Sequence, residues 1–572
     1  MRRGIREAVE TTKEAPSFLI APTGYGKTSS LIALWNWIEE EWGRVIHVLP
    51  LRALVYDILT KAVRKLGPEK LGYQAMIDEV RMKADSREVA IRKSPYMTAE
   101  YNVTTYDSYL LTLYVMPVAE FGKENCHWDA GFLMVLSSLT VMDETHVVLA
   151  TEEVGDPSEE YEKCLAVTKH TLELLTELKR YPLVMTATLP AKLLAWLLKG
   201  LKGARVHLCL GRRGAEYYSG LSGITFHGLD RDFSQYIDEY LTCVKTEISD
   251  APLLDDIASC LDENADKVLV VCNTVKRAIE VYDALRFNSK GYEVMLLHSR
   301  LVEADKAHRL KMLDELVKKG KPLILVATQV VEAGVDYDFD ALVTEVAPPA
   351  SLIQRAGRIV RRLERLDEGA KGRIIINISS PSVDSAKSVY PKVLINETIK
   401  ALAGLSDSGF DWRFGEARNS FLNLLSVYDS LFQDVSTSYY EYVALLESLL
   451  LRDPMAAFSG KKLLNTLDAF FKGSLLREAA LVPLYVPGRG SIAVSLSFVK
   501  RRIKLLDLKD GRAVAVFRSL ESGEILERPV PLRCLFNKPC STLTGPPGSR
   551  GALELLGLRL KEGAYDDERG LT

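Results

Sequence analysis

The sequence predicts an α/β protein with two parallel-sheet domains in tandem, followed by a helical connector and a small β-rich C-terminal domain. Short β-branched runs alternate with longer amphipathic segments, and this alternation is typical of a parallel sheet with crossover helices. One series of such runs comprises residues 18–20, 45–49, 139–142 and 183–186. A second series begins after residue 220 and comprises 268–272, 294–297, 323–327, 341–344 and 374–377.

The rest of the chain changes character twice. Beyond residue 380 the pattern becomes leucine-rich and helical, as at 438–452 and 461–472. From residue 482 short alternating runs are separated by Gly and Pro, which predicts strands at 482–486, 491–498, 513–518 and 525–530. We expect a hinge at the Gly-rich, charged stretch 211–232. The predicted domains are 1–210, 211–380, 381–480 and 481–572.

Composition limits the class of protein. The 572 residues are 47% apolar and 26% charged, which is typical of a globular chain and excludes a fibre or a long disordered tail. No apolar run approaches the roughly 18 residues that span a bilayer, and no apolar stretch follows the basic N-terminus, so we expect a cytoplasmic protein without a membrane partner. A net charge of -3 means that any nucleic acid must be bound by a local groove. The eight cysteines form no C-x-x-C pair, which disfavours a zinc or disulfide framework.

The strongest motif is APTGYGKT at residues 21–28. It follows the first predicted strand and precedes a predicted helix at 29–41, so its backbone N–H groups and the helix N-terminus would point at a polyphosphate. Lys27 would reach the β- and γ-phosphates and the Thr28 hydroxyl would hold Mg²⁺. Ala21 replaces the usual first Gly. The expected nucleotide-binding residues of this loop are Thr23, Gly24, Tyr25, Gly26, Lys27 and Thr28.

A second motif, VMDETH at residues 141–146, ends an apolar run. Asp143 at a strand end is placed to hold Mg²⁺, and Glu144 can accept a proton from the attacking water. The third motif, MTATLP at residues 185–190, also follows a strand. Small hydroxyl groups there can bond to the acidic motif and to the other domain. We expect His146, Thr186 and Thr188 to couple the two domains.

The second domain carries ATQVVEAGVD at 327–336 and QRAGRIVR at 354–361. On a predicted helix, Arg358 and Arg361 share a face and Gln354 lies one turn earlier. Arginines aimed across a cleft stabilise charge on a transferring phosphoryl group. Because Asp143 and Arg358 belong to different predicted domains, the nucleotide should lie between the domains and its hydrolysis should move them. We also expect Gly334 and Asp336 to bind nucleotide and Glu332 to couple the domains.

GYGKT, DETH, TATLP and QRAGRIVR in this order resemble superfamily-two helicases with two RecA-like domains. The run LLHSR at 296–300 and the block from VATQ to IVRR are similar in detail to the helicase subunit of type I CRISPR interference. The resemblance covers residues 15–380. It implies ATP- and Mg²⁺-dependent, 3′-to-5′ movement on single-stranded DNA to unwind target DNA. The implied partners are single-stranded DNA and the CRISPR RNA-guided surveillance complex.

The resemblance also implies a set of strand-contacting residues, which would hold phosphates rather than read bases. They are Pro50, Arg52, Thr104 and Thr105 in the first domain and Asn273, Thr274, His298, Arg300 and Thr328 in the second. Individual members could instead cap helices. The basic cluster at 500–504 is either a solvated face or a DNA or partner surface.

Two departures from the family pattern matter. No His in the chain is followed by Asp, so the resemblance to split systems predicts a separate HD nuclease subunit. No Gln precedes the P-loop, which leaves the recognition of adenine open. Two alternatives remain: an RNA-remodelling DExH-box helicase, which a preference for 2′-OH groups would reveal, and a catalytically inert helicase-like scaffold. The presence of Lys27, Asp143, Glu144, Arg358 and Arg361 speaks against the scaffold.

Overall fold

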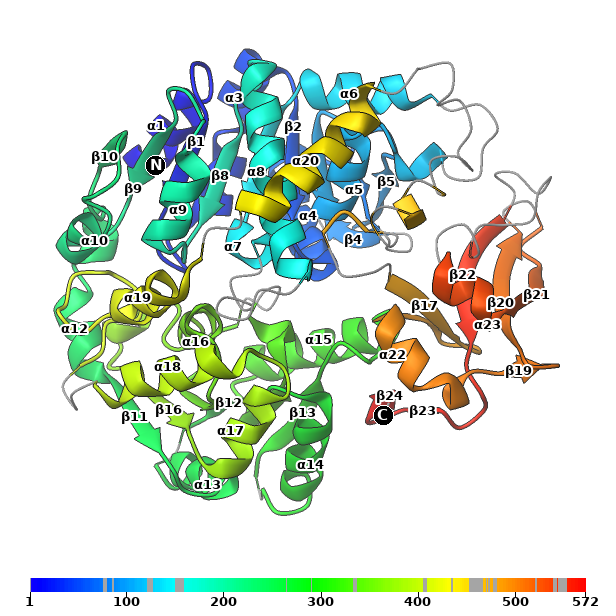
Figure 1. Ribbon diagram of the computed structural model, residues 1–572. Helices are drawn as coiled ribbons and strands as arrows, with labels where there is room; N and C mark the ends of the chain where they lie inside the picture. Colours follow the sequence, from blue (N-terminus) through cyan, green and yellow to red (C-terminus); the bar gives the residue numbers. More distant parts are fainter. Residues whose placement is uncertain are drawn as a thin grey trace.

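The computed structural model places two large parallel sheets beside each other, with a smaller β-rich domain at one side (Figure 1). The described residues are 2–571 except for 76–79, 85–86, 121–126, 150–158, 264, 290, 333–336, 405–408, 434–435, 452–464, 466, 470, 472–473, 477–480, 520–521, 539–542 and 544–552. Among these described residues, no helix is both long and apolar enough to span a bilayer.

The first sheet has ten strands in the order β10-β9-β1-β8-β7-β2-β6-β3-β5-β4. Its strands are β1 (Ser17–Ile20), β2 (Val45–Leu49), β3 (Leu71–Gln74), β4 (Val80–Ala84), β5 (Arg87–Lys93), β6 (Tyr101–Thr105), β7 (Leu139–Asp143), β8 (Leu183–Thr186), β9 (Arg205–Leu208) and β10 (Ile224–Phe226). All neighbours are parallel except β4 and β5. The central strands are buried throughout, as expected when helices cover both faces.

The helices of this domain are α1 (Arg3–Thr11), α2 (Lys27–Ala33), α3 (Trp35–Trp42), α4 (Arg52–Leu66), α5 (Tyr106–Leu113), α6 (Trp128–Leu136), α7 (Thr145–Val148), α8 (Glu159–Glu177), α9 (Ala191–Leu198) and α10 (Arg212–Tyr217). The helix predicted at 29–41 is two helices that meet at Leu34. The stretch predicted as a hinge instead contains α10 and β10, and Ile224 of β10 pairs with Val206 of β9. The first sheet therefore extends beyond the predicted boundary at residue 210.

The second sheet has six parallel strands in the order β11-β16-β15-β12-β14-β13. They are β11 (Val244–Ser249), β12 (Lys267–Val271), β13 (Glu293–Leu297), β14 (Leu323–Ala327), β15 (Ala341–Glu345) and β16 (Gly372–Asn377). Its helices are α11 (Arg231–Ser234), α12 (Ile237–Cys243), α13 (Leu253–Asp262), α14 (Val275–Leu285), α15 (Glu303–Lys318), α16 (Pro349–Ala356) and α17 (Ser380–Lys387). The two sheets confirm the predicted α/β class with parallel strands and crossover helices.

The helical connector does not form a separate body. It contains α18 (Lys392–Ala403), α19 (Phe421–Leu431) and α20 (Ser436–Leu451). Helix α19 contacts α9 of the first domain as well as α16 and α18. Helix α20 returns across the first domain and lies beside α8 (Figure 1). The connector thus holds both parallel-sheet domains.

The C-terminal part is a β-rich domain with its own hydrophobic core. Its elements are β17 (Leu481–Val486), β18 (Gly490–Ser495), α22 (Leu496–Arg501), β19 (Leu508–Lys509), β20 (Arg512–Ser519), β21 (Ile525–Pro531), α23 (Leu532–Asn537), β22 (Leu553–Arg559), β23 (Tyr565–Asp566) and β24 (Gly570–Leu571). The strand predicted at 491–498 ends at Ser495, because the Ser495 hydroxyl accepts the Phe498 N–H and caps α22. The final hairpin reaches the second domain, where the Leu571 N–H bonds to the Arg300 carbonyl.

Candidate active site

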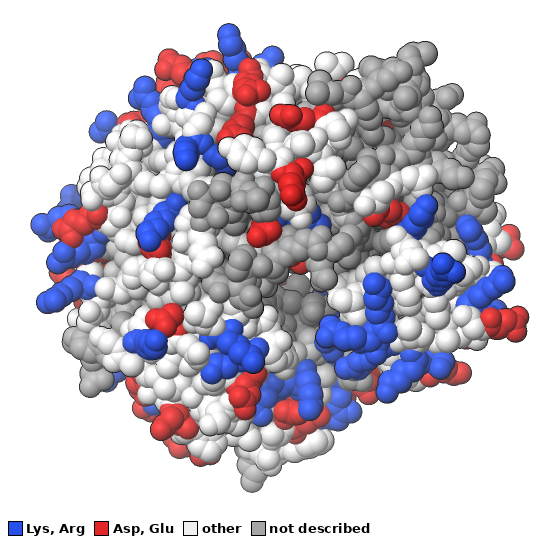
Figure 2. Space-filling model, viewed as in Figure 1, with Lys and Arg blue, Asp and Glu red and all other residues white. Residues whose placement is uncertain are grey.

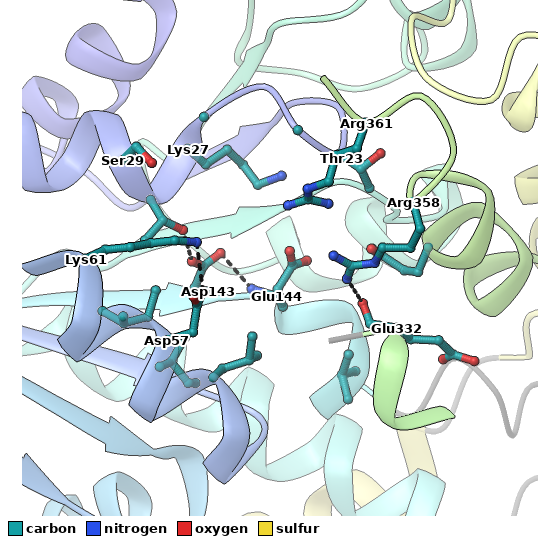
Figure 3. A pocket seen from close by; sticks show the side chains of 18 of the residues that line it. Thr23, Lys27, Ser29, Asp57, Lys61, Asp143, Glu144, Glu332, Arg358 and Arg361 are labelled. Carbon is teal, nitrogen blue, oxygen red and sulfur yellow. Dashed lines mark hydrogen bonds and ion pairs between the residues drawn. The ribbon is translucent and has the colours of Figure 1, made fainter. Parts of the chain in front are cut away.

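A cavity of about 520 Å³ lies between the two parallel-sheet domains. The ends of β2 and β7 and the segments that follow β1 and β14 line it, as is usual for ligand sites at the carboxyl edge of parallel sheets. The expected site residues that line it are Thr23, Gly24, Gly26, Lys27, Thr28, Asp143, Glu144, His146, Glu332, Gln354, Arg358 and Arg361. Figure 3 shows Arg358 and Arg361 reaching from one side toward Lys27 and Glu144 on the other. The structure therefore brings together residues that are up to 338 positions apart, from Thr23 to Arg361.

The P-loop turns sharply between β1 and α2. Gly24 and Gly26 have φ values of 74° and 84°, a left-handed conformation that favours glycine. Lys27 begins α2, and its Nζ donates to the carbonyls of Ala21 at 3.1 Å and Pro22 at 3.2 Å. The Tyr25 side chain does not line the cavity, because it packs behind the loop and its hydroxyl donates to Asp230 at 2.6 Å. Only the backbone of Tyr25 remains a candidate ligand of a phosphate.

Asp143 is held by three hydrogen bonds. Its Oδ2 accepts from the Thr28 hydroxyl at 3.0 Å and lies 3.2 Å from Nε2 of His47, while Oδ1 accepts the Glu144 N–H at 2.9 Å. Burial opposes ionisation of Asp143, but the hydrogen bond and charge of His47 outweigh it and lower the carboxyl pKa below its usual range. The ring of His47 is fixed in turn by the Tyr101 hydroxyl, 2.9 Å from Nδ1.

His47 is a site residue that the sequence motifs did not predict. It lies inside the fully buried strand β2 and belongs to no motif. The only signal was a polar residue in an otherwise apolar strand, VIHVL. A buried polar side chain requires a partner, and that partner could not be identified without the sheet order that places β2 beside β7.

Glu144 follows Asp143 in a left-handed backbone conformation, with φ 48°. Burial raises the pKa of Glu144, and the positive charges of Lys27, Arg358 and Arg361 oppose that rise. A carboxylate with a raised pKa is a better proton acceptor near neutral pH.

The residues expected to couple the domains occupy two sides of the cavity. His146 Nδ1 lies 3.1 Å from the Thr186 hydroxyl, which also accepts the Thr188 N–H at 3.2 Å. Burial lowers the pKa of His146 to about 3, so its ring is neutral at physiological pH. Glu332 lies on the second domain, where its carboxylate accepts from Arg355 Nε at 2.8 Å. The structure thus brings the DETH and TATLP motifs into contact, with Glu332 across the cavity from them.

The two cavity arginines do not lie on a helix, contrary to the sequence prediction. Helix α16 ends at Ala356, and Arg358 and Arg361 follow in a turn in which Val360 has φ 44°. Instead of continuing the helix, this segment pairs with Phe339: the Arg358 carbonyl accepts the Phe339 N–H at 3.0 Å, and the Val360 N–H donates to the Phe339 carbonyl at 3.1 Å. Gln354 remains on the helix, as predicted.

The cavity suits a polyphosphate with a hard cation. Lys27, Arg358 and Arg361 supply positive charge, and among the described side chains the buried Thr23 Oγ1 and Gln354 Nε2 have no hydrogen-bond partner. Thr28 and Asp143 offer a hydroxyl and a carboxylate oxygen, the ligand type that Mg²⁺ takes when phosphates complete its shell. Among the described residues there is no group of three or more His, Cys, Asp or Glu that could hold a metal ion by itself, so a cation here would need phosphate oxygens as further ligands. Gly334 and Asp336 lie outside the described residues.

The expected strand-contacting residues lie at the carboxyl ends of neighbouring strands. Pro50 and Arg52 follow β2, Thr104 and Thr105 end β6, and Thr328 follows β14. In the first sheet β2 lies next to β7 and β6 lies beyond β2, whereas the P-loop follows β1 on the other side of β7. Nucleotide residues and strand-contacting candidates therefore occupy adjacent halves of one sheet edge.

Several of these candidates have internal partners instead of open surfaces, among them the fully buried Thr104, whose hydroxyl donates to the Gln74 carbonyl at 2.7 Å. The Asn273 amide donates to the Val346 carbonyl at 2.8 Å and its oxygen accepts from Arg355 at 3.2 Å. Thr274 caps α14, and the buried His298 donates to the Arg569 carbonyl at 2.9 Å. Resemblance alone could not reveal that the C-terminal hairpin covers His298.

Arg300 does reach a basic surface. Its guanidinium lies 4.8 Å from the centre of the Phe498 ring on α22. Burial lowers the pKa of Arg300, and the like charges of Arg501 and Arg502 add to that effect. Figure 2 shows Lys and Arg side chains gathered over the position of α22.

Two parallel sheets with a P-loop, an acidic pair and an arginine turn around a shared cavity define a helicase of two RecA-like domains. The comparisons agree. Residues 5–195 match the model of the DEAD/DEAH box helicases, and residues 264–364 match that of the C-terminal part of the CRISPR-associated nuclease/helicase Cas3.

Named relatives narrow the class. A CRISPR-associated nuclease/helicase Cas3 of Methanothermobacter thermautotrophicus is 30% identical over 66% of this chain and 42% of its own length. A CRISPR-associated helicase Cas3 of Thermoproteus tenax is 26% identical over 67% of this chain and 58% of its own length. The crystal structure of T. fusca Cas3-ATP has a TM-score of 0.56 at 20% identity, covering 86% of this chain and 59% of that one, which supports the fold.

Both parallel-sheet domains of the chain are thus similar to Cas3-type helicases. The chain spans about half the length of the curated relatives it matches, with 42%, 52% and 58% of the first three covered.

Proposed function

We propose that the chain is an ATP- and Mg²⁺-dependent helicase that moves 3′ to 5′ on single-stranded DNA and unwinds target DNA in CRISPR interference. The observation that carries the proposal is the convergence of Lys27, Glu144 and Arg361 on one cavity between two domains. A structural relative, T. fusca Cas3, has a crystal structure described as Cas3-ATP, which supports ATP as the nucleotide.

In the proposed reaction, the P-loop N–H groups and Lys27 hold the β- and γ-phosphates of ATP. Thr28 and Asp143 would hold Mg²⁺, and the bound ion would supply positive charge against the negative charge of the phosphates. Glu144 orients the attacking water and accepts its proton. Arg358 and Arg361 stabilise the negative charge that develops on the γ-phosphoryl group. Gly357 brings the second domain close to Thr23 of the P-loop beside the site.

Hydrolysis would drive movement because the P-loop and the arginine turn, which hold the nucleotide from opposite sides, belong to separate domains. Loss of the γ-phosphate removes the attraction between the P-loop and the arginine turn, so the domains can separate and close again on the next ATP. The candidates after β2, β6 and β14 would hold the DNA backbone beside the nucleotide. Contacts to phosphates suit a motor that passes over any sequence.

Two further expectations concern partners. A structural relative belongs to a CRISPR RNA-guided surveillance complex, which supports such a complex as the partner. We expect DNA cutting to come from an HD nuclease outside these residues, because none of the eight histidines is followed by Asp.

The test is ATP hydrolysis with single-stranded DNA, with single-stranded RNA and without nucleic acid. The proposal expects stimulation by DNA, weak stimulation by RNA, no DNA cleavage with added Mg²⁺, and loss of hydrolysis in Glu144→Gln. Stimulation by RNA alone would favour an RNA-remodelling helicase. Wild-type hydrolysis that survives Glu144→Gln would refute the assigned base. Duplexes with a 3′ or a 5′ tail then test polarity, since only the 3′-tailed duplex should be unwound.

A further inference from the structure

A loop between the helices of the connector touches both parallel-sheet domains. This bridging loop, residues 410–420, is closed by pairing of Asp411 with Ser420. The Asp411 carboxylate accepts backbone N–H groups from Arg413, Phe414, Glu416 and Ala417 at 2.7–3.1 Å. These four bonds hold the loop together in the absence of a regular helix or strand.

The bridging loop is anchored on each domain separately. On the first domain, the Phe414 carbonyl accepts the Gly211 N–H at 2.7 Å, and Glu416 pairs with Arg212 at 3.0 Å. On the second domain, the Trp412 indole N–H donates to the Thr246 hydroxyl at 2.9 Å. The side chain between these anchors, Arg413, is only 1% exposed.

Arg413 joins the P-loop to the arginine turn. Its Nη2 donates to the Thr23 carbonyl at 3.2 Å and to the Arg361 carbonyl at 3.2 Å, and its Nη1 donates to the Val360 carbonyl at 3.0 Å. The loop approaches so closely that a Cβ on Gly24 would lie 2.4 Å from Nη2. A planar guanidinium can make this three-way connection, whereas the point charge of a lysine cannot.

Burial of the Arg413 guanidinium carries a cost in folding free energy. A buried charge is destabilising without an ionic partner, and Arg413 bonds to carbonyls while it lies over the rings of Phe233 and Tyr240 at 5.4 and 5.8 Å. It does not line the cavity, so it is not a candidate ligand of the nucleotide. What it does is fix the backbone of Arg361 relative to the backbone of Thr23.

We propose that Arg413 is a positioning residue for ATP hydrolysis, which sets the arginine turn at the correct distance from the P-loop. The inference rests on the proposed function, and it adds a part of the connector to the hydrolytic machinery. Arg413 would act through Arg361, whose backbone it holds, so its loss would slow the chemical step while the P-loop still binds ATP.

The experiment measures DNA-stimulated ATP hydrolysis by the whole chain. The variants are Arg413→Lys, Arg413→Gln, Arg361→Ala and the double variant Arg413→Lys/Arg361→Ala, with Arg212→Ala as the matched control. Arg212 anchors the same loop from the surface but touches neither the P-loop nor the arginine turn. Thermal unfolding and binding of a non-hydrolysable ATP analogue accompany each assay.

For Arg413→Lys we expect kcat to fall about 10- to 100-fold, the range that a displacement of about 1 Å produces, with the KM for ATP almost unchanged. The double variant should be no slower than Arg361→Ala alone, because both changes remove the same contribution. Arg212→Ala should match the wild type. Arg413→Gln, whose shorter and uncharged side chain ends in a single NH2 group, should be at least as slow as Arg413→Lys.

Three results would overturn the proposal. An unchanged kcat in Arg413→Lys, or defects that multiply in the double variant, would show that Arg413 does not act through Arg361. Weak binding of the ATP analogue by both Arg413 variants would make Arg413 part of the fold or of the phosphate site. Absence of hydrolysis by the wild type would instead refute the proposed function, so the two failures are distinguishable.

Discussion

The nucleotide cavity and the junction of the C-terminal hairpin both join separate parts of the chain, but they use charge in opposite ways. In the cavity, Asp143, Lys27 and Arg358 are 3%, 7% and 6% exposed. At the junction, Arg569 pairs with Asp283 at 3.0 Å while both side chains are more than one third exposed. Buried charges are strongly coupled and fixed in position, whereas exposed pairs are screened by solvent and salt.

From this difference we expect substitutions of the cavity charges to impair function more than substitutions of the junction charges. Cavity charges attract a ligand with little reorganisation, which is what electrostatic catalysis requires. Exposed charge pairs at the junction can separate and re-form at little cost in free energy, so they would allow the C-terminal domain to move. The same hairpin nevertheless covers His298 and contacts Arg300, which links the junction to the proposed DNA surface.

The largest effect should follow Lys27→Ala. The cavity would lose the charge that faces the β- and γ-phosphates, so both ATP binding and hydrolysis should become undetectable. Isothermal titration with ATP and Mg²⁺ measures the first and phosphate release the second. Lys61→Ala, on α4 at the edge of the cavity, is the comparison, and equal losses in the two variants would contradict the specific role of Lys27.

A smaller effect should follow His47→Leu. The change keeps similar volume but removes the donor that holds Asp143, and loss of a group that orients a metal ligand usually costs about 10- to 100-fold in affinity or activity. Hydrolysis measured against Mg²⁺ concentration should show a raised requirement for the metal. His47→Gln can still donate and should recover most of the activity. An unchanged Mg²⁺ dependence in His47→Leu would remove His47 from the site.

The smallest effect should follow Arg569→Ala. Because the Arg569–Asp283 pair is exposed, hydrolysis without DNA should stay within about twofold of the wild type. DNA-stimulated hydrolysis should become more sensitive to salt, since the hairpin beside Arg300 is held less firmly. A titration from low to high NaCl measures this. Loss of basal hydrolysis in Arg569→Ala would mean that the junction is as tightly coupled as the cavity.

The sequence could predict the motifs of the cavity because each lies within one strand and the loop that follows it. Strand periodicity located β1, β7 and β8 to within one residue, and carboxyl ends of parallel strands share an edge. What it could not predict depends on contacts between distant segments. The end of α16 at Ala356 accompanies the pairing of the arginine turn with Phe339, and Arg413 comes from a loop with no motif.

The predicted hinge failed for a related reason. Glycine and charge in 211–232 suggested a linker, but a three-residue strand there is stabilised by its pairing with β9 rather than by its own sequence. Resemblance likewise assigned Asn273 and His298 by position in a motif. Their partners, Val346 and the hairpin carbonyl of Arg569, are visible only in the folded chain.

The central claim is that residues from both parallel-sheet domains act on one nucleotide. The most direct test measures binding of an ATP analogue and DNA-stimulated hydrolysis in Arg361→Ala and Arg358→Ala beside the wild type. The account predicts nearly normal binding with hydrolysis reduced by about 10³-fold or more, the lower end of an arginine-finger effect. Hydrolysis close to the wild-type rate in both variants would contradict it, because the second domain would then contribute nothing to the chemical step.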